Sequence, residues 1–424
     1  MKCVESEPVV ITGLALVTPY GVGWLPVLEG VKQGRTGYGP LTAIDCHTWP
    51  IQAAGWVADP PSDSLGVFNN KLRNMGKYVR LGVMATRLAM QSARIEAGGF
   101  VSERFGAFIG TGTHGHNAEG LFSAFALSRD ANDQMDLRLL GQDGIDRVHP
   151  WWLLSTISNN LIFFLTHFFQ LKGPNTNCCN SAIASAHALD RAMEALHLGE
   201  VDYALWGGAD CPVNWQLLSD FAVMGFSAEG PPEKTVPMRP YSPRASGPVM
   251  SDAAAFAILE TRSHAEKRGV SPIVGISQPT FAGSNLDALE PAADGRDTRQ
   301  VVAALLAKRR NPGIPFQVHL SGTGLERWDN SELAGLREFP GRESWRVSSG
   351  KAWVGHSFAA SFAVETLMAA MALKENVGLG FPADAETLGE CSLLPASAQL
   401  HHSEAMVLGQ CFGGNTTGVL LHDV

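Results

Sequence analysis

Short apolar runs that end in glycine turns alternate with segments of helical apolar spacing along this chain. The runs predict buried strands at residues 9–16, 105–109, 201–206, 254–259, 273–276 and 419–421. Helical spacing predicts helices at residues 85–93, 182–198 and 262–268, and Gly199 is a stop signal for the second of them. Strands that alternate with helices indicate an α/β architecture.

The order of strand, glycine turn and helix starts again after Glu260. A chain of 424 residues also exceeds the size at which one hydrophobic core stops growing. We therefore expect two fused halves, residues 1–262 and 263–424. Residues 283–299, rich in proline, glycine and aspartate, predict a surface loop. Residues 151–169 predict one buried helix, since polar side chains interrupt the run too often for a membrane span.

Composition narrows the function classes. With 45% hydrophobic and 17% charged residues the chain is globular, and a net charge of -9 argues against a general nucleic-acid binder. The 7 cysteines are an odd number without metal-ligand spacing, which indicates free thiols, no metal site and a reducing compartment. The first residues lack the apolar core of a signal peptide, so we expect a cytoplasmic protein. The glycine run at 110–115 fits a dinucleotide motif, but its context is wrong for a nicotinamide enzyme.

The turn at residues 175–181 carries two adjacent cysteines, Cys178 and Cys179, directly before a predicted helix. A thiol at the first turn of a helix faces unpaired backbone N–H groups and the positive end of the helix dipole. Both favour the thiolate, which is the nucleophilic form. The alternative is two small buried thiols on a packed turn.

Several motifs, in the right order, resemble the β-ketoacyl synthases of the thiolase-fold condensing enzymes over nearly the whole chain. They lie at residues 9–13, 19–21, 171–178, 206–210, 239–260, 351–356 and 410–415. The resemblance implies a thiolase-like α/β fold, with two duplicated halves in a five-layer αβαβα arrangement. It also implies a dimer that needs no cofactor and takes substrates from the phosphopantetheine of acyl carrier protein.

By this resemblance Cys178 accepts the acyl group, and Cys179 is a bystander. His356 donates to the thioester carbonyl, and Lys351 is its electrostatic neighbour. Phe412 takes the place of a gating phenylalanine beside the nucleophile. The backbone N–H groups at Gly413 and Gly414 would serve an oxyanion hole.

The chain departs from the family at Ser321, where a histidine is expected. That histidine polarises the malonyl thioester during decarboxylation, and removing one such donor typically costs about 10²–10³ in rate. His319, two residues upstream, is an alternative donor. Ser242, Ser246 and Asp252 also replace usual family residues.

Loss of the histidine with retention of the cysteine leaves two functions open. One is acyl transfer to Cys178, as in non-elongating ketosynthases, with or without decarboxylative condensation. The other is a non-condensing partner subunit that resembles the chain-length factor of a heterodimeric polyketide ketosynthase. The sequence leaves open whether the dimer is homo- or heteromeric.

A basic cluster precedes a predicted helix and consists of Lys71, Arg73, Lys77 and Arg80. It resembles the family's docking helix for acyl carrier protein, which is acidic. The alternative is a solvated helix face.

Overall fold

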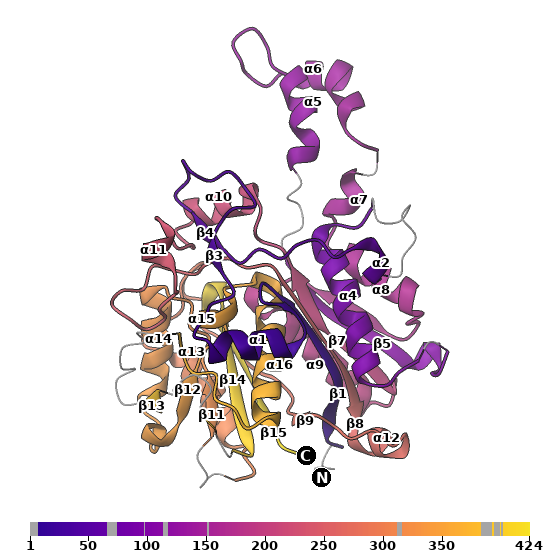
Figure 1. Cartoon of the computed structure of the whole chain (residues 1–424), viewed down its shortest axis with the longest axis vertical. Helices are drawn as coiled ribbons and strands as arrows, with labels where there is room; N and C mark the ends of the chain where they lie inside the picture. Colours follow the sequence, from indigo (N-terminus) through magenta and orange to yellow (C-terminus); the bar gives the residue numbers. More distant parts are fainter. Residues whose placement is uncertain are drawn as a thin grey trace.

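The computed structural model describes residues 7–65, 74–96, 98–112, 118–150, 152–311, 316–382, 392–393, 399 and 402–424. In the described part of the chain a large mixed sheet has 13 strands, and Figure 1 shows helices on both of its faces. Its ten main strands fall into two halves. Those of the first half are β1 (Val9–Thr18), β5 (Phe105–Thr111), β6 (Asn175–Cys178), β7 (Tyr203–Asp210) and β8 (Ala253–Thr261). Those of the second half are β9 (Val274–Ile276), β11 (Gln317–His319), β12 (Arg346–Ser348), β14 (Glu404–Cys411) and β15 (Asn415–His422). The shorter strands are β2 (Gly21–Val22), β3 (Gly39–Pro40), β4 (Ala53–Ala54), β10 (Thr280–Gly283) and β13 (Ser392–Leu393).

The helices connect and cover these strands. In the first half they are α1 (Trp24–Lys32), α2 (Ser62–Leu65), α4 (Lys77–Ser92), α5 (Phe122–Leu127), α6 (Leu137–Leu139), α7 (Trp152–Thr156), α8 (Asn160–Phe169), α9 (Ala184–His197), α10 (Trp215–Val223) and α11 (Pro232–Thr235). In the second half they are α12 (Arg262–Lys267), α13 (Arg296–Leu306), α14 (Glu326–Leu336), α15 (Lys351–Val354) and α16 (Ser361–Lys374). Single turns are η1 (Ser102–Arg104), η2 (Ala118–Leu121), η3 (Leu140–Gly144), η4 (Ile145–Arg147), η5 (Ser181–Ile183), η6 (Arg342–Ser344), η7 (Phe358–Ala360) and η8 (Phe412–Gly414).

The two halves repeat one strand order. The first half runs β6-β5-β7-β8-β1 and the second runs β12-β11-β14-β15-β9, so each half places its third, second, fourth, fifth and first main strand side by side. The halves join where β1 pairs antiparallel with β9, with Val9 opposite Ile276. This repetition is the arrangement of a duplicated fold. The predicted boundary at residue 262 coincides with the first residue of α12, and as a domain limit it stays a prediction.

Alternation along β8 shows how the layers form. Ala255, Ala257 and Leu259 pack into the core shared with α9 and α16, whereas Phe256 and Ile258 pack into the core beneath α4 and α8. Successive side chains of a strand point to opposite faces, so one buried strand serves two cores at once.

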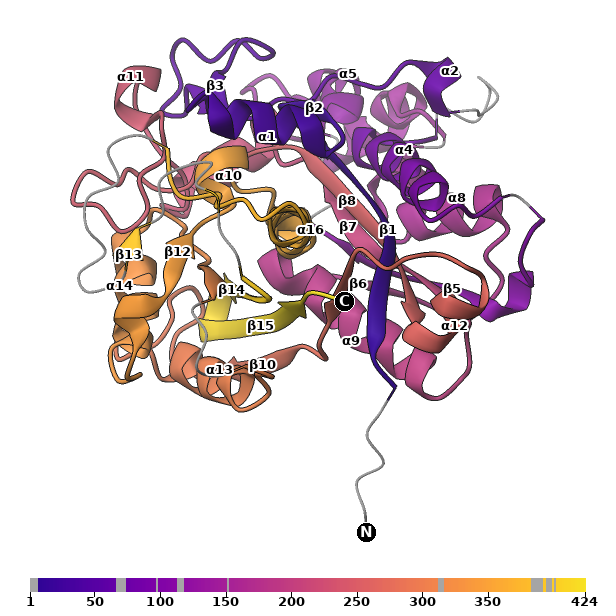
Figure 2. The ribbon, with the colours of Figure 1, turned by 60° about the horizontal axis from the view of Figure 1, so that its bottom comes forward.

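The central helices α9 and α16 lie between the two halves of the sheet, as Figure 2 shows for α16. Residues of α16 are buried on all sides, which fits a helix without a polar face. A third core lies between the second half of the sheet and the helices α13 and α14. The succession of outer helices, sheet, central helices, sheet and outer helices is the five-layer arrangement expected of a thiolase-like fold.

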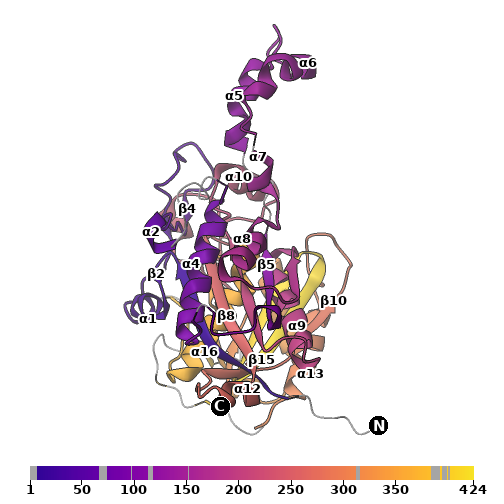
Figure 3. The same ribbon diagram turned by 90° about the vertical axis from the view of Figure 1, so that its right-hand side faces the viewer.

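Residues 118–150, here called the helical arm, project away from the body of the molecule in two perpendicular views (Figures 1 and 3). The arm contains η2, α5, α6, η3 and η4. Among its side chains are large apolar groups in contact with solvent: Phe122, Leu127, Met135, Leu137 and Ile145. The arm therefore exposes apolar surface that this chain does not cover by itself.

Most predicted elements are confirmed, and two are wrong. The segment predicted as one buried helix, residues 151–169, contains two helices in its described part, α7 and α8, and Leu153 and Phe163 remain exposed. The predicted loop at 283–299 ends early because α13 begins at Arg296. Among the described residues, no helix is long and apolar enough to cross a membrane.

Candidate active site

The turn that follows β11 carries Ser321 and is held by two carboxylates of α14. Ser321 N donates to Glu332 Oε1 at 2.8 Å, and Thr323 N donates to Asp329 Oδ1 at 2.9 Å. Burial raises the pKa of Asp329 to about 7 against the opposing effect of the N–H groups of Tyr241 and Thr323, which donate to its carboxylate. The glycines at 322 and 324 have φ values of 51° and 75°, so the turn needs residues that tolerate the left-handed region. These contacts fix the position of Ser321.

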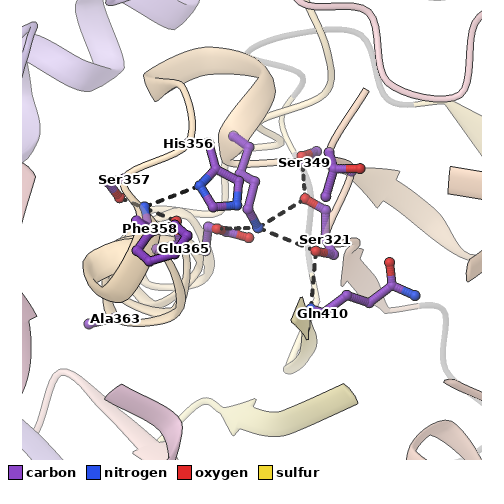
Figure 4. Close-up of polar contacts among 12 residues, drawn as sticks. Ser321, Ser349, His356, Ser357, Phe358, Ala363, Glu365 and Gln410 are labelled. Carbon is purple, nitrogen blue, oxygen red and sulfur yellow. Dashed lines mark hydrogen bonds and ion pairs between the residues drawn. The ribbon is translucent and has the colours of Figure 1, made fainter. Parts of the chain in front are cut away.

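Ser321 lies beside a buried ion pair (Figure 4). Lys351 Nζ lies 2.7 Å from Glu365 Oε1, and the two side chains are only 2% and 4% exposed. Lys351 also donates to the backbone and hydroxyl oxygens of Ser321, at 3.2 and 3.3 Å. The N–H of Gln410 donates to the same hydroxyl oxygen at 3.2 Å. Burial raises the pKa of Glu365 to about 7, and Lys351 acts against this rise.

His356 follows α15 and is fully buried. Its Nδ1 accepts the N–H of Phe358 at 3.1 Å, so in the neutral ring this bond places the hydrogen on Nε2. Burial, together with the nearby Lys351 charge, holds the pKa of His356 well below its usual range. Nε2 is buried without a hydrogen-bond partner among the described residues. The imidazole is therefore a neutral donor with a free N–H.

Phe412 packs in an aromatic cluster over His356. Its ring centroid lies 4.7 Å from that of Phe226 and 5.6 Å from that of Trp328. Phe226 in turn meets the His356 ring edge-on at 5.5 Å. A pocket of about 310 Å³ opens over this cluster, and its lining includes all three aromatic residues and Arg327. The cluster separates His356 from this pocket.

Cys178 and Phe412 pack against the same core cluster, but Cys178 stands on a strand rather than in a helical turn. Cys178 is the last residue of β6, opposite Gly110 of β5, and the helical turns begin only at Ser181. The prediction placed this thiol at the first turn of a helix, but the strand ends and an extended step intervenes. Burial raises the pKa of Cys178 to about 11, with a smaller contribution from Cys179. In the part of the chain that the structure describes, no hydrogen bond joins Cys178 to His356 or Lys351.

The residues that do meet the cluster lie in η5 and at the end of β14, and sequence reasoning missed them. The turn η5 contacts both β14 and η7, the turn that follows His356. The thiol of Cys411 donates to the carbonyl oxygen of Asn180 at 3.7 Å, and the N–H of Ile183 donates to the same oxygen at 3.2 Å. The predicted oxyanion donors, the N–H groups at Gly413 and Gly414, stay a prediction. The positive end of a helix dipole acts on the first helical residues. Because the predicted helix begins at residue 182, the same argument applied there could have found η5.

The alternative donor His319 and two cations of the basic cluster, Lys77 and Arg80, have partners of their own. His319 is buried, bonds Ser348 Oγ through Nδ1 at 2.8 Å, and has its pKa lowered to about 3 by burial. Lys77 pairs with Asp252 at 2.6 Å and Arg80 pairs with Asp59 at 3.0 Å, so both cations have partners within the chain.

The remaining predictions concern the other two cations of the basic cluster and metal binding. Lys71 and Arg73 lie outside the described residues, and docking of acyl carrier protein at the basic cluster stays a prediction. Within the described ranges no group of three or more histidine, cysteine or acidic residues could hold a metal ion.

Comparison with known families agrees with the fold. The N-terminal domain of β-ketoacyl synthase matches residues 6–265, and the C-terminal domain matches residues 281–379. The chain therefore belongs to the β-ketoacyl synthase family of fatty acid and polyketide biosynthesis. These enzymes use no cofactor of their own, and their substrate is carried on the phosphopantetheine of acyl carrier protein. The resemblance seen in the sequence is confirmed.

The chain is similar to relatives of several kinds. It is 25% identical over 386 residues to 3-oxoacyl-[acyl-carrier-protein] synthase 2 of Synechocystis, covering 89% of this chain and 88% of that protein. It is 24% identical over 423 residues to putative polyketide beta-ketoacyl synthase 1 of Streptomyces halstedii, covering 98% of both. It is 24% identical over 372 residues to nodulation protein E of Rhizobium leguminosarum bv. trifolii, covering 87% of both.

Solved structures share the fold at low identity. The ishigamide ketosynthase/chain length factor matches with a TM-score of 0.83 and 20% identity, over 99% of this chain and 100% of the other. The ketosynthase ApeO in complex with its chain length factor ApeC from Xenorhabdus doucetiae matches with a TM-score of 0.77 and 18% identity, over 99% and 98%.

Proposed function

We propose that this chain is a non-condensing subunit that pairs with a catalytic ketosynthase paralogue and shapes the tunnel for its growing chain. One observation carries the proposal. The turn η5, which meets the His356 and Phe412 segments, presents the methyl group of Ala182, whereas Cys178 stands at the end of an outer strand. A methyl group cannot accept an acyl chain, so Ala182 supplies no nucleophile to the polar cluster.

The polar cluster itself supports the same proposal. Ser321 receives hydrogen bonds from both Lys351 and Gln410, and Lys351 is also paired with Glu365. A donor for decarboxylation must be free to meet the developing charge on the substrate. Of the side-chain nitrogens described in this cluster, His356 Nε2 alone remains without a partner. A single neutral donor is better suited to holding a carbonyl oxygen than to supporting decarboxylative condensation.

The exposed parts of the first half support a protein partner. Strand β6 ends the sheet order, so its outer backbone edge can pair with another chain. The helical arm exposes apolar side chains, of which Leu137 is 74% exposed and Ile145 is 54% exposed. Exposed apolar surface of this kind marks protein interfaces. Solved complexes of ketosynthases with chain length factors have the same fold as this chain.

Acyl transfer tests this function. The chain, alone and co-purified with a ketosynthase that keeps its nucleophilic cysteine, is incubated with octanoyl-acyl carrier protein, and acyl groups are mapped by intact-mass and peptide mass spectrometry. We expect an adduct on the paralogue's cysteine and none on this chain. Cys178→Ala and its neighbour Cys179→Ala should both leave product formation by the pair unchanged.

A Cys178-dependent octanoyl adduct on this chain would contradict the proposal. That result would establish acyl transfer to Cys178 as the function, and the pKa of that thiol would then have to fall on carrier or partner binding. A self-paired chain that carries the adduct on Cys178 would also decide for a homodimeric enzyme.

A further inference from the structure

A pocket of about 490 Å³, here called the β1 pocket, opens where α1, α4 and the end of α16 meet over β1. Its volume lies in the range of about 300–1,000 Å³ that is typical of small-molecule sites. The wall is mostly apolar and includes Leu14, Val22, Trp24, Leu88, Ile273 and Met371. Segments that are far apart along the chain therefore build one apolar cavity.

A gap along one edge of β1 explains why this cavity exists. On the side away from β8, β1 pairs with β9 at residues 9–11 and with β2 at residues 17–18. The register of β1 shifts directly after Ile11, as in a β-bulge, and the pairing with β9 ends there. Leu14 and Ala15 lie between the two pairings and line the pocket. The described strands thus leave this stretch of β1 facing a cavity.

The polar side chains of the β1 pocket can all donate hydrogen bonds. Of the described residues that line it, Lys374 alone is charged, and it is exposed at the last position of α16 without an ion-pair partner in the described chain. The hydroxyl oxygen of Ser92 accepts the N–H of Leu14 at 3.4 Å, which leaves the hydroxyl hydrogen for an acceptor. Trp24 is 7% exposed, and its indole N–H has no partner among the described residues.

We propose that the β1 pocket binds a small amphipathic carboxylate, with its apolar chain along the wall and its carboxylate facing Lys374. Apolar surface removed from water supplies affinity, and charge complementarity selects the headgroup. A cationic amphiphile would instead bring two like charges together. The inference goes beyond the proposed function, because no lining residue of the pocket belongs to the polar cluster around Ser321.

Isothermal titration calorimetry of the full chain at pH 7 tests the β1 pocket with octanoate and octylammonium, which share an apolar chain and differ in charge. We expect one octanoate to bind per chain, and octylammonium to bind at least about tenfold more weakly. Lys374→Met should weaken octanoate binding about tenfold, since the charge is lost and an apolar side chain stays. Lys374→Glu should reverse the preference between the two probes.

Lys32→Glu is the matched control, since Lys32 is also exposed in the last turn of a helix but does not line the pocket. It should leave both affinities unchanged. The proposal is overturned if octanoate does not bind, if both probes bind the wild type equally, or if Lys374→Glu leaves the octanoate affinity unchanged. Mapping of octanoyl groups after incubation with octanoyl-acyl carrier protein decides the proposed function separately, so either can fail alone.

Discussion

Two regions of the molecule differ in how their groups find partners. One is the buried cluster of Lys351, Glu365 and Ser321, here called the junction. The other is the exposed strand β6 together with the helical arm, here called the edge. In the junction, buried charges find partners within the chain, as Lys351 does with Glu365 and Ser321. At the edge, a strand and several apolar side chains face outward. The buried charges of the junction are thus neutralised within one chain, whereas the edge exposes backbone and apolar groups that the proposed partner would cover.

Breaking the junction should have the largest effect. Lys351→Met leaves Glu365 buried without its partner, and we expect the free energy of unfolding at pH 8, measured by urea denaturation, to fall by about 3–5 kcal/mol. The double variant Lys351→Met/Glu365→Leu should regain most of this loss.

A surface pair provides the control for this prediction. Arg262 and Glu266 form an i,i+4 pair with side chains 44% and 60% exposed. Arg262→Met should change stability by less than about 0.5 kcal/mol. Equal losses for Lys351→Met and Arg262→Met would contradict the distinction between the two regions.

Asp210 makes the free energy of unfolding depend on pH. It is buried at the end of β7 and accepts the N–H of Ala359 at 3.2 Å, and burial raises its pKa to about 7. Because this folded-state pKa exceeds the unfolded value of about 3.9, Asp210 contributes stability that is complete below about pH 4 and is lost as the pH rises towards 7. Asp210→Asn removes this dependence.

The measurement is the free energy of unfolding of both proteins across this pH range. We expect the variant's value minus that of the wild type to rise by up to about 1.4 kcal/mol per pH unit between about pH 5 and 7. A difference that stays flat with pH would show that Asp210 keeps an ordinary pKa in the folded chain.

Changing the edge should have the smallest effect on the chain alone. Leu137→Asp in the arm should change the free energy of unfolding by less than about 0.5 kcal/mol, since Leu137 is 74% exposed. The same variant should weaken association with a ketosynthase paralogue, measured by sedimentation. Leu198→Asp, at a site 66% exposed outside the arm, is the matched control and should leave association intact. Equal association of both variants would place the interface elsewhere.

Much of the fold followed from local patterns. The apolar runs at 9–16 and 254–259 and the helical spacing at 182–198 correspond to β1, β8 and η5 with α9. Such periodicities report which faces are buried, and burial decides these elements. The predictions for residues 151–169 and 283–299 were wrong because local polarity does not show where a helix breaks or begins. Packing against neighbouring elements decides that.

The sequence by itself determined the family, the duplicated α/β fold and the departure at Ser321, because these depend on residue order alone. Only the tertiary structure decided which side chains meet. It brought Ser321 to Lys351, 30 positions further along the chain, and to Gln410 near the end of β14. His356, 35 positions after Ser321, lies near the Lys351 charge. The tertiary structure also placed Cys178 at the end of β6, before the helical turns begin, and brought the Cys411 thiol to the carbonyl oxygen of Asn180. The physical reason is that strand ends and turn geometry, set by long-range pairing, aim each side chain, and no local pattern encodes that direction.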